Sequence, residues 1–471
     1  MKPTHYIKEF GTITIGSSNK PFNSSELEID SVSFQSLTNF IEENQNQDDI
    51  DKAFSIYQKK GKRFIKVKNY VGVIETKQGV VIEILPKTFI GKNGEEADKD
   101  DSKKLLLTML KTVKNSPFIN LNVAHLKEQN NFPILEVFIA SFLDELIKLT
   151  SKELRGDYVS RQENSKFLKG KLLLKEHIKF NSINKARFYC HFDEFNTNIP
   201  PNKLIKSTLT RLFSITSSNQ NKKKIIKSLQ HFDSVNICSN VDSDIAYCKT
   251  RAKAISNYGN LIVWSEVFLK NKSFTNFHGN SINQAILFPM EKVFESYIAF
   301  LLKRHCHGIT IDAQDKRYCF ISQQKDINDL NYSIKKFALK PDIVINNDEV
   351  IIDTKWKILN ADSKKYDIKE ADIYQMHAYG KRYQDENTDK PAPRLGLIYP
   401  RNPNFEEKLF QMRYGQDLLL DVIPFDFGNK NAGEEIKKIV NVFIKLEPCL
   451  YIEQEEQQLN IAAENETQYG R

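Results

Sequence analysis

The sequence predicts a mixed α/β protein built from several domains. Three observations lead to this prediction: a β-rich first part, a largely helical middle part, and a last part that alternates helices and strands. A chain of 471 residues has room for roughly three domains. The predicted division is residues 1–92, 93–284 and 285–451, followed by a tail over 452–471.

The first part, residues 1–92, is predicted to be β-rich because alternating or β-branched runs are bounded by glycine, asparagine and lysine. These runs are "GTITIG", "RFIKVKNYVGVIET" and "GVVIEILPKTF". The polar stretch "NGEEADKDDSKK" then predicts a loop that leads into a helix over "LLLTMLKTV".

The middle part, residues 93–284, is predicted to be largely helical and to contain a basic segment. A helix is expected over 133–154, because Pro133 suits a first helical position and apolar residues recur at helical spacing. Acidic residues interrupt this apolar stretch, which predicts a buried helix and not a membrane span. The basic segment is "RGDYVSRQENSKFLKGKLLLKEHIKFN". In "CHFDEFNTNIPPNKLIKSTLTRLF", we expect a loop that ends at the double proline, followed by a helix.

The last part, residues 285–451, has an α/β order. We expect a helix over "FPMEKVFESYIAFLLKRH" and strands over "ALKPDIVINN" and "EVIIDTKW", separated by the turn "NND". A helix through "EADIYQMHAYGKRY" and a strand over "RLGLIYP" follow. The tail over 452–471 is rich in glutamate and glutamine and lacks periodicity, so it is expected to be disordered.

Charge and cysteine content limit the class of protein. The net charge of +8 permits contact with a polyanion but does not require it. The start "MKPTHYIKEF" lacks the apolar run of a secretory signal, and the six cysteines contain no CxxC pair. A reduced, cytoplasmic setting is therefore expected, without a membrane.

The stretch "LKPDIVINNDEVIIDTKWK" carries the clearest chemistry. Residues two apart on a strand share a face, so Asp353 and Lys355 emerge together. Asp342 begins the preceding strand, and pairing through the short turn would bring its carboxylate close to that of Asp353. Two converging carboxylates repel each other unless a cation lies between them, and Mg²⁺ prefers carboxylate oxygens. The sequence therefore predicts a Mg²⁺ site in which Lys355 orients a water or stabilises charge on a transition state.

Each motif alone has a simpler interpretation. A lone "PD" is usually a turn, and "DxK" on a strand is usually a surface ion pair. Here the acid and the lysine lie inside "IIDTKWK", beside a β-branched run that is expected to be buried, where unpaired charges are costly.

Two helical pairs accompany these strands. Gln375 and Tyr379 are four residues apart and share a helix face, where they can position the lysine or contact a phosphate. Glu291 and Glu295 form another such pair upstream. One of them is a candidate to complete the metal site, and Glu295 is favoured because it lies within "VFESY". For both glutamates, a solvated acid is an equally open alternative.

The ordered set "FE", "PD", "DTK" and "QxxxY" resembles the PD-(D/E)xK nuclease superfamily, which carries these elements on a helix, two strands and a helix. More narrowly, most of the chain resembles the McrC family, the nuclease subunits of the McrBC modified-cytosine restriction systems. The segments that carry this resemblance are "NYVGVIETKQGVVIEILPKT", "LRGDYVSRQENSKFLKGKL", "CHFDEFNTNIPPNKLIK", "LFPMEKVFESYIAFLL", "PDIVI", "IIDTKWK", "DIYQMHAYG" and "LGLIYP".

The resemblance implies roles for specific residues. Asp342 and Asp353 would ligate Mg²⁺, and Lys355 would be the catalytic lysine. Glu295 would correspond to the glutamate of the first core helix, as a further metal ligand. Gln375 and Tyr379 would be the QxxxY pair.

The resemblance also implies a function and a partner. The chain would be a Mg²⁺-dependent endonuclease subunit that cuts foreign or modified double-stranded DNA. McrC-like subunits act with McrB, an AAA+ GTPase ring, into which their N-terminal and middle regions insert to stimulate GTP hydrolysis. The present sequence contains no GxxxxGK[ST], so we expect the nucleotide to be bound by the partner and not by this chain.

Other interpretations stay open at this point. One is a non-catalytic assembly factor that activates a ring GTPase, and another is a stand-alone DNA repair nuclease. A zinc site at "RHCHG" with Cys319 is disfavoured, because the two histidines flank the cysteine too closely for the usual ligand spacings. A packed cysteine is expected there instead.

Overall fold

The computed structural model describes residues 3–444 except 19–20, 23, 46–47, 90–95, 115, 122–132, 153, 184, 271–280, 322–335, 388, 410, 416 and 430. Contacts between residues divide the chain into two units. Unit 1 comprises Met1–Pro86 and Lys103–Pro289, and unit 2 comprises Lys87–Ser102 and Met290–Arg471. Both units combine helices with sheets, as the predicted mixed α/β class requires.

The predicted domain boundaries stay predictions. The last predicted part begins at residue 285, and unit 2 takes over from Met290. The predicted disordered tail over 452–471 lies outside the described residues.

Unit 1 contains two four-stranded sheets built mainly from the β-rich start of the chain. One sheet has, in order, β1 (Thr4–Lys8), β7 (Val81–Leu85), β6 (Tyr70–Thr76) and β11 (Ile282–Pro289). The other has β3 (Glu26–Ile29), β2 (Thr12–Ile15), β5 (Lys62–Val67) and β4 (Phe54–Lys59). Every residue of β6 and β7 is buried, so these two strands lie at the centre of the core.

Two helices interrupt the strands predicted for this region. They are α1 (Ser31–Glu43) and α2 (Asp48–Ala53). The side chain of Asp30 accepts hydrogen bonds from the N–H groups of Val32 and Ser33, which caps the free donors at the start of α1. The residues buried on α1 include Phe34, Leu37 and Ile41, whose spacing is helical.

The middle of the chain supplies most helices of unit 1. The helix expected over 133–154 is α5 (Ile134–Thr150), and the helix expected after the double proline is α7 (Pro200–Ile215). The other helices are α8 (Asn219–Leu229), α9 (Val241–Thr250), α10 (Gly259–Lys270) and the 3₁₀ turns η1 (Pro117–Asn120), η2 (Gln230–Phe232) and η3 (Ser256–Tyr258). Among the described residues, no helix is long and apolar enough to span a bilayer.

The buried carboxylate of Glu136 joins α5 to the start of α8. It accepts hydrogen bonds from the hydroxyl of Thr216 (2.6 Å), the N–H of Ser217 (2.6 Å) and the side-chain amide of Asn221 (2.8 Å). A negative charge at a helix N-terminus is favourable, because the free N–H groups there carry partial positive charge.

The loop expected over "NGEEADKDDSKK" is shorter than predicted. Helix α3 (Lys99–Leu110) begins inside that polar stretch, with Asp100 and Asp101 in its first turn. Acidic residues stabilise a first helical turn. The polar residues from Lys99 onward, which suggested a loop, therefore begin the helix.

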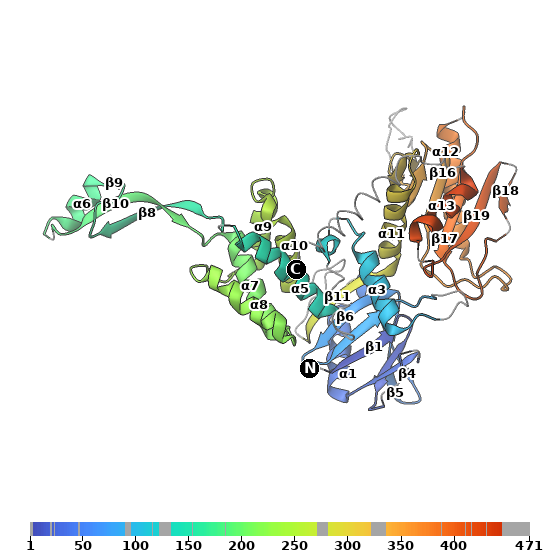
Figure 1. Ribbon diagram of the computed structural model, residues 1–471, viewed down its shortest axis with the longest axis horizontal. Coiled ribbons are helices and arrows are strands. Elements are labelled where there is room, and N and C mark those ends of the chain that lie inside the picture. Colours follow the sequence, from blue (N-terminus) through green and yellow to red (C-terminus); the bar gives the residue numbers. More distant parts are fainter. Residues whose placement is uncertain are drawn as a thin grey trace, which may run out of the picture. The chain divides into compact units, whose positions relative to one another are not determined.

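The loop predicted over "CHFDEFNTN" is wrong. Strand β10 (Phe188–Asn196) pairs there with β8 (Asp157–Ser165), and β9 (Lys171–Leu172) joins the other side of β10. Figure 1 shows β8 and β10 as a long two-stranded ribbon whose far end carries β9 and α6 (Leu174–Asn181). We call residues 157–196 the ribbon. Most of its side chains are at least partly exposed, which explains why no buried face marks its strands in the sequence.

The base of the ribbon is fastened to the helices of unit 1. The N–H of Arg155 donates to the hydroxyl of Tyr258 at 3.0 Å. The side-chain amide of Asn202 donates to the carbonyls of Arg155 (2.9 Å) and Thr197 (2.8 Å), which lie on either side of the ribbon.

Unit 2 is built on a six-stranded mixed sheet (Figure 1). Its strands, in order, are β12 (Ile311–Ala313), β15 (Ile343–Ile345), β16 (Val350–Thr354), β17 (Arg394–Pro400), β19 (Leu418–Phe425) and β18 (Met412–Tyr414). The inner strands β16, β17 and β19 are parallel, and the other pairs are antiparallel. A separate pair joins β13 (Cys319–Ile321) to β14 (Lys336–Ala338).

Helices cover both faces of this sheet. On one face, Gly380 of α12 (Glu370–Glu386) packs against Leu395 and Leu418. On the other, Phe443 of α13 (Ala432–Phe443) packs against Gly396, and α11 (Met290–His305) contacts α13. The helices and strands expected for the last part are thus confirmed as α11, β15, β16, α12 and β17.

Gly72 of β6 is a position where only glycine fits. Its φ is +138°, and a Cβ there would lie 2.0 Å from the carbonyl oxygen of Ile286 on β11. We expect Gly72→Ala to lower the free energy of unfolding of the chain by about 2–4 kcal/mol, measured by urea denaturation. The matched control is Gly259→Ala, because no atom lies within 4 Å of that Cβ. Equal denaturation midpoints for the two variants would contradict this prediction.

Candidate active site

The two predicted aspartates face each other at one end of the β15–β16 hairpin. Ile343 pairs with Ile352, so the next pair along the same register is Asp342 and Asp353. The carboxylate of Asp342 accepts hydrogen bonds from the N–H (2.7 Å) and the hydroxyl (2.8 Å) of Thr354. The structure therefore brings together the two acids that the sequence predicts to converge.

The side chain of Lys355 links β16 to α12. Its ammonium forms an ion pair with Asp353 at 2.7 Å and donates to the side-chain carbonyl of Gln375 at 2.9 Å. The amide of Gln375 in turn donates to the hydroxyl of Tyr379 at 2.7 Å. The predicted QxxxY pair thus reaches the lysine through its glutamine.

Glu295 lies within electrostatic reach of both aspartates. Its carboxylate accepts a hydrogen bond from the side chain of Gln314 at 2.8 Å and is partly buried. Burial raises the pKa of Glu295, and the charge of Asp353 raises it further. Glu291 is exposed and raises the pKa of Asp353 through its charge. Burial and the neighbouring charge of Asp353 therefore disfavour the charged form of Glu295.

The acids at this site destabilise one another's charged forms. Burial raises the pKa of Asp342 well above its ordinary value, and the charges of Asp353 and Glu295 add to the shift. Burial also raises the pKa of Asp353, although Lys355 opposes this. Burial lowers the pKa of Lys355, but the charge and hydrogen bond of Asp353, together with the charges of Asp372 and Asp342, outweigh this effect, so the net shift is upward. An additional cation would relieve the remaining repulsion.

Two carboxylates, those of Asp342 and Asp353, are placed to bind Mg²⁺, but in the described part of the chain three ligands are not already arranged around one point. Within the described ranges, no group of three or more His, Cys, Asp or Glu side chains converges as metal ligands. Asp342, Asp353 and Glu295 each have the separate partner described above. Mg²⁺ is usually held by one or two carboxylates and keeps several waters, so Asp342 and Asp353 suffice. The third ligand at Glu295 stays a prediction.

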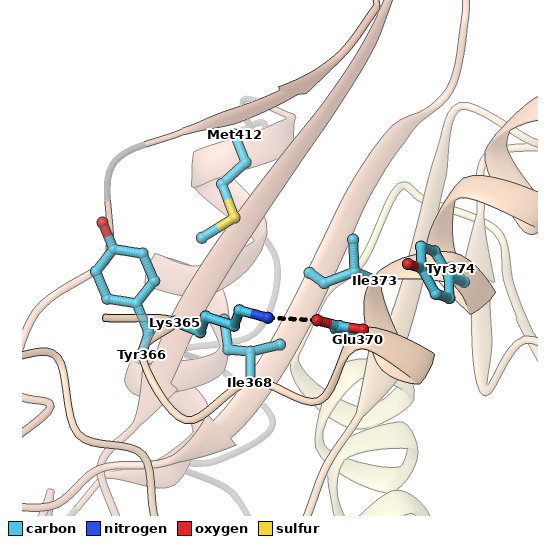
Figure 2. Close-up of a pocket in the computed structure, with 7 residues that line it drawn as sticks. All are labelled: Lys365, Tyr366, Ile368, Glu370, Ile373, Tyr374 and Met412. Carbon is cyan, nitrogen blue, oxygen red and sulfur yellow. Dashed lines mark hydrogen bonds and ion pairs between the residues drawn. The ribbon is translucent and has the colours of Figure 1, made fainter. Parts of the chain in front are cut away.

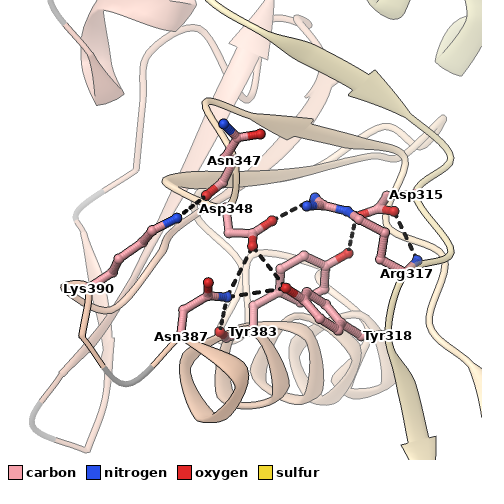
Figure 3. A network of polar contacts seen from close by, with 8 residues as sticks. All are labelled: Asp315, Arg317, Tyr318, Asn347, Asp348, Tyr383, Asn387 and Lys390. Carbon is pink, nitrogen blue, oxygen red and sulfur yellow. Dashed lines mark hydrogen bonds and ion pairs between the residues drawn. The ribbon is translucent and has the colours of Figure 1, made fainter.

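The turn that sets this register is held by a polar network. Asn346, Asn347 and Asp348 all have positive φ, a conformation that non-glycine residues adopt at some cost. Figure 3 shows Arg317 bridging Asp348 (2.6 Å) and Asp315 (2.7 Å).

Helix α12 contributes two further contacts to the same network. Tyr383 donates to Asp315 at 2.8 Å, and Asn387 donates to Asp348 at 3.0 Å. These contacts fix the hairpin turn to the helix that carries Gln375.

The sequence prediction missed Asp372, a buried residue at the start of α12. Its carboxylate accepts from the ammonium of Lys357 at 2.7 Å and from the hydroxyl of Tyr399 at 3.5 Å. The ammonium of Lys355 lies 3.7 Å from its other oxygen. Asp372 lies three residues before Gln375 and seven before Tyr379, so helical spacing places all three on one face. That spacing was a signal available in the sequence.

A pocket with a volume of 330 Å³ opens beside the first turns of α12 (Figure 2). Its lining is mainly apolar and consists of Lys365, Tyr366, Ile368, Glu370, Ile373, Tyr374 and Met412. None of the predicted site residues lines it. On α12, the pocket residues Glu370 and Tyr374 project away from the face that carries Asp372, Gln375 and Tyr379.

The cysteine of "RHCHG" is packed, as expected. Cys306 is 3% exposed, and burial raises the pKa of its thiol to about 11. Together with the lack of a converging ligand group among the described residues, this leaves the zinc alternative without support.

Comparisons with known proteins place the chain in a family. A family model described as "McrBC 5-methylcytosine restriction system component" matches residues 65–400. No curated protein sequence matches the chain.

Two solved structures resemble the chain. The first is the refined half-complex from the tetradecameric assembly of Thermococcus gammatolerans McrB AAA+ hexamers with bound McrC. One of its chains aligns with a TM-score of 0.66 at 16% identity, over 94% of this chain and 100% of that chain. The second is the cryo-EM structure of the Thermococcus gammatolerans McrBC complex, with a TM-score of 0.47 at 18% identity, over 64% of this chain and 88% of that chain.

At 16% identity, the first likeness establishes a shared fold. The family match is independent of it and covers more than half of the chain. The chain therefore belongs to the family of McrBC 5-methylcytosine restriction system components.

Proposed function

We propose that this chain is the Mg²⁺-dependent DNA endonuclease subunit of a McrBC-like restriction system, with a PD-(D/E)xK nuclease domain in unit 2. One observation carries the proposal: Asp342, Asp353 and Lys355 meet at the end of one hairpin, with Gln375 bonded to the lysine. Family membership supports the biological setting.

The chain's own residues would divide the work of phosphodiester hydrolysis. Asp342 and Asp353 would hold Mg²⁺, which supplies positive charge beside the scissile phosphate when bound. Lys355, held by Gln375, would orient the attacking water or stabilise the negative charge that builds on the phosphate. Tyr379 would fix the glutamine through its hydroxyl.

We further propose that the chain acts with a McrB-like AAA+ GTPase ring on modified or foreign double-stranded DNA. The solved structure that shares its fold holds McrB AAA+ hexamers with bound McrC. The sequence has no GxxxxGK[ST] of its own, so nucleotide hydrolysis would be supplied by the partner.

The ribbon is the element of unit 1 best suited to contact this ring. It contains residues 157–181 of the basic segment, and the family resemblance implies that this segment binds the partner. It also exposes large apolar side chains, including Phe167 (73%), Leu174 (65%) and Ile178 (66%). Exposed apolar groups among basic residues are typical of a protein-binding surface.

A non-catalytic GTPase-activating subunit is the alternative from another class. One observation favours it: the ribbon lies in unit 1, whereas the acids and Lys355 lie in unit 2. Contact with the ring would therefore not require the acids or the lysine. Measuring DNA cleavage and GTP hydrolysis in the same complex separates the two proposals.

Lys355→Met tests the proposed chemistry directly. With the ring partner, GTP and methylated DNA, we expect cleavage to fall by roughly 100-fold or more, because the charge that stabilises the transition state is lost. Stimulation of the partner's GTPase should be unchanged. Lys364→Met, which alters an exposed lysine of the same unit, is the control. Normal cleavage by the Lys355 variant would refute the assignment, and cleavage without partner or nucleotide would point to a stand-alone nuclease.

Asp342→Asn tests the electrostatics through stability. Because the pKa of Asp342 is raised in the folded chain, its ionisation disfavours folding. The resulting destabilisation is absent at acidic pH and sets in as the pH rises through the raised pKa. We therefore expect the metal-free variant to melt a few degrees above the unaltered chain at neutral pH, with roughly 2–4 °C for each kcal/mol.

Acidification should remove the difference between the Asp342 variant and the unaltered chain, as scanning calorimetry across a pH series would show. Added Mg²⁺ should raise the melting temperature of the unaltered chain more than that of the variant. The control is Asp362→Asn, at an exposed acid. A variant that melts below the unaltered chain at every pH would contradict the prediction.

Replacing Leu174 and Ile178 by serine tests the ribbon. We expect this double variant to stimulate the ring GTPase at least roughly tenfold less, because exposed apolar anchors commonly dominate interface energies. Folding should be unaffected, since both side chains are exposed.

The control for the ribbon is Ile226→Ser with Ile237→Ser, two similarly exposed residues of unit 1 (52% and 61%). Equal stimulation by the ribbon variant and the control would show that the ribbon does not contact the ring.

A further inference from the structure

We propose that Asp372 is a positioning residue that takes over the ammonium of Lys355 when a divalent cation occupies Asp353. This inference rests on the proposed nuclease function and adds a residue to its site. No substrate contact is assigned to Asp372, which acts through the lysine.

Three groups surround the ammonium of Lys355. Asp353 lies at 2.7 Å, the carbonyl of Gln375 at 2.9 Å and a carboxylate oxygen of Asp372 at 3.7 Å. Only 19% of the Lys355 side chain is exposed, so solvent replaces little of what these partners supply. Asp353 is its nearest countercharge in this arrangement.

Cation binding at Asp353 would remove that countercharge. The carboxylate would then neutralise the divalent ion, which repels the ammonium. A poorly solvated ammonium without an anionic partner is costly. Asp372 is the nearby carboxylate that can accept it with a small movement, and Gln375 can hold the ammonium during the change. Lys355 would then keep its place beside the scissile phosphate.

Asp372 is itself held in place by partners within the chain. One of its oxygens binds the ammonium of Lys357 at 2.7 Å and receives the hydroxyl of Tyr399 at 3.5 Å. The other oxygen faces Lys355. Asp372 is 7% exposed, so these three side chains leave little room for another partner.

Two rival roles must be separated from this one. Asp372 could be a metal ligand, or the Lys357–Asp372 ion pair could only fasten the segment after β16 to α12. Both rivals predict that Asp372 matters whether or not residue 355 is a lysine. The proposed role predicts that its effect on metal binding requires the ammonium.

A double-mutant cycle on Mg²⁺ affinity makes this distinction. Isothermal titration calorimetry with Mg²⁺ alone would be applied to four full-length proteins: unaltered, Asp372→Asn, Lys355→Met, and both together. Asp372→Asn should weaken Mg²⁺ binding by roughly 3- to 10-fold when Lys355 is present, because the ammonium then competes for Asp353. With Lys355→Met, it should change affinity by less than about twofold.

Equal weakening in both backgrounds would overturn the proposal in favour of a ligand or a structural role. If Asp372→Asn leaves Mg²⁺ affinity unchanged in both backgrounds, the proposal is also overturned, because Asp372 would then not position the lysine. If the unaltered chain binds no Mg²⁺, the proposed function itself fails and this inference fails with it, a result distinct from the other two.

A second pair of variants guards against misfolding. Asp372→Glu keeps the charge and should restore most of the Mg²⁺ affinity that Asp372→Asn loses. Glu370→Gln, on the same helical turn but exposed, should leave Mg²⁺ affinity unchanged. With DNA and the ring partner, Asp372→Asn should lower kcat by roughly 10- to 100-fold without changing KM, as expected for a residue that acts in the transition state. Failure of Asp372→Glu to restore affinity would contradict a role based on charge.

Discussion

The concentration of negative charge at the end of the β15–β16 hairpin is the constraint on which the rest of unit 2 depends. Burial raises the pKa values of Asp342, Asp353 and Glu295, and neighbouring carboxylates add to each shift. Asp353 and Glu295 act on Asp342, and Asp353 acts on Glu295. Left alone, such groups would move apart or bind protons. Their persistence therefore requires a rigid frame, supplied by the sheet register, the Arg317 network and α12. The repulsion costs stability at this end of the hairpin, whereas burial of the apolar core between α12 and the sheet stabilises the same unit.

The sequence predicted the parts of this site that depend on local periodicity. A strand repeats every two residues, which placed Asp353 and Lys355 on one face, and the short turn brought Asp342 opposite them. Helical spacing likewise placed Gln375 beside Tyr379. These inferences need only the chain's own geometry over a few residues. Asp372 shares that helical face, but its importance depends on Lys357 and Lys355, which arrive from a different element.

The features that the sequence could not predict depend on distant pairing or on exposed strands. Strand β11 completes a sheet with β6, although about two hundred residues separate them in the chain. The ribbon pairs β8 with β10 while most of its side chains stay at least partly exposed, so no apolar alternation marks it. Helix α1 was missed for a different reason, because its capping residue Asp30 follows a short strand without any break. For β11 and the ribbon, tertiary context decides the structure.

Each acid of the site has a partner within the chain. Asp353 forms an ion pair with Lys355, Asp342 accepts hydrogen bonds from the backbone and hydroxyl of Thr354, and Glu295 accepts one from Gln314. Each acid thus has an internal partner that a divalent ion must replace or outcompete. Under the proposed function, metal binding and the position of Lys355 would be coupled, since both involve the carboxylate of Asp353. Such a site would keep its lysine in place during metal binding only if a second anion lies within reach of the ammonium, and Asp372, 3.7 Å away, is a carboxylate so placed.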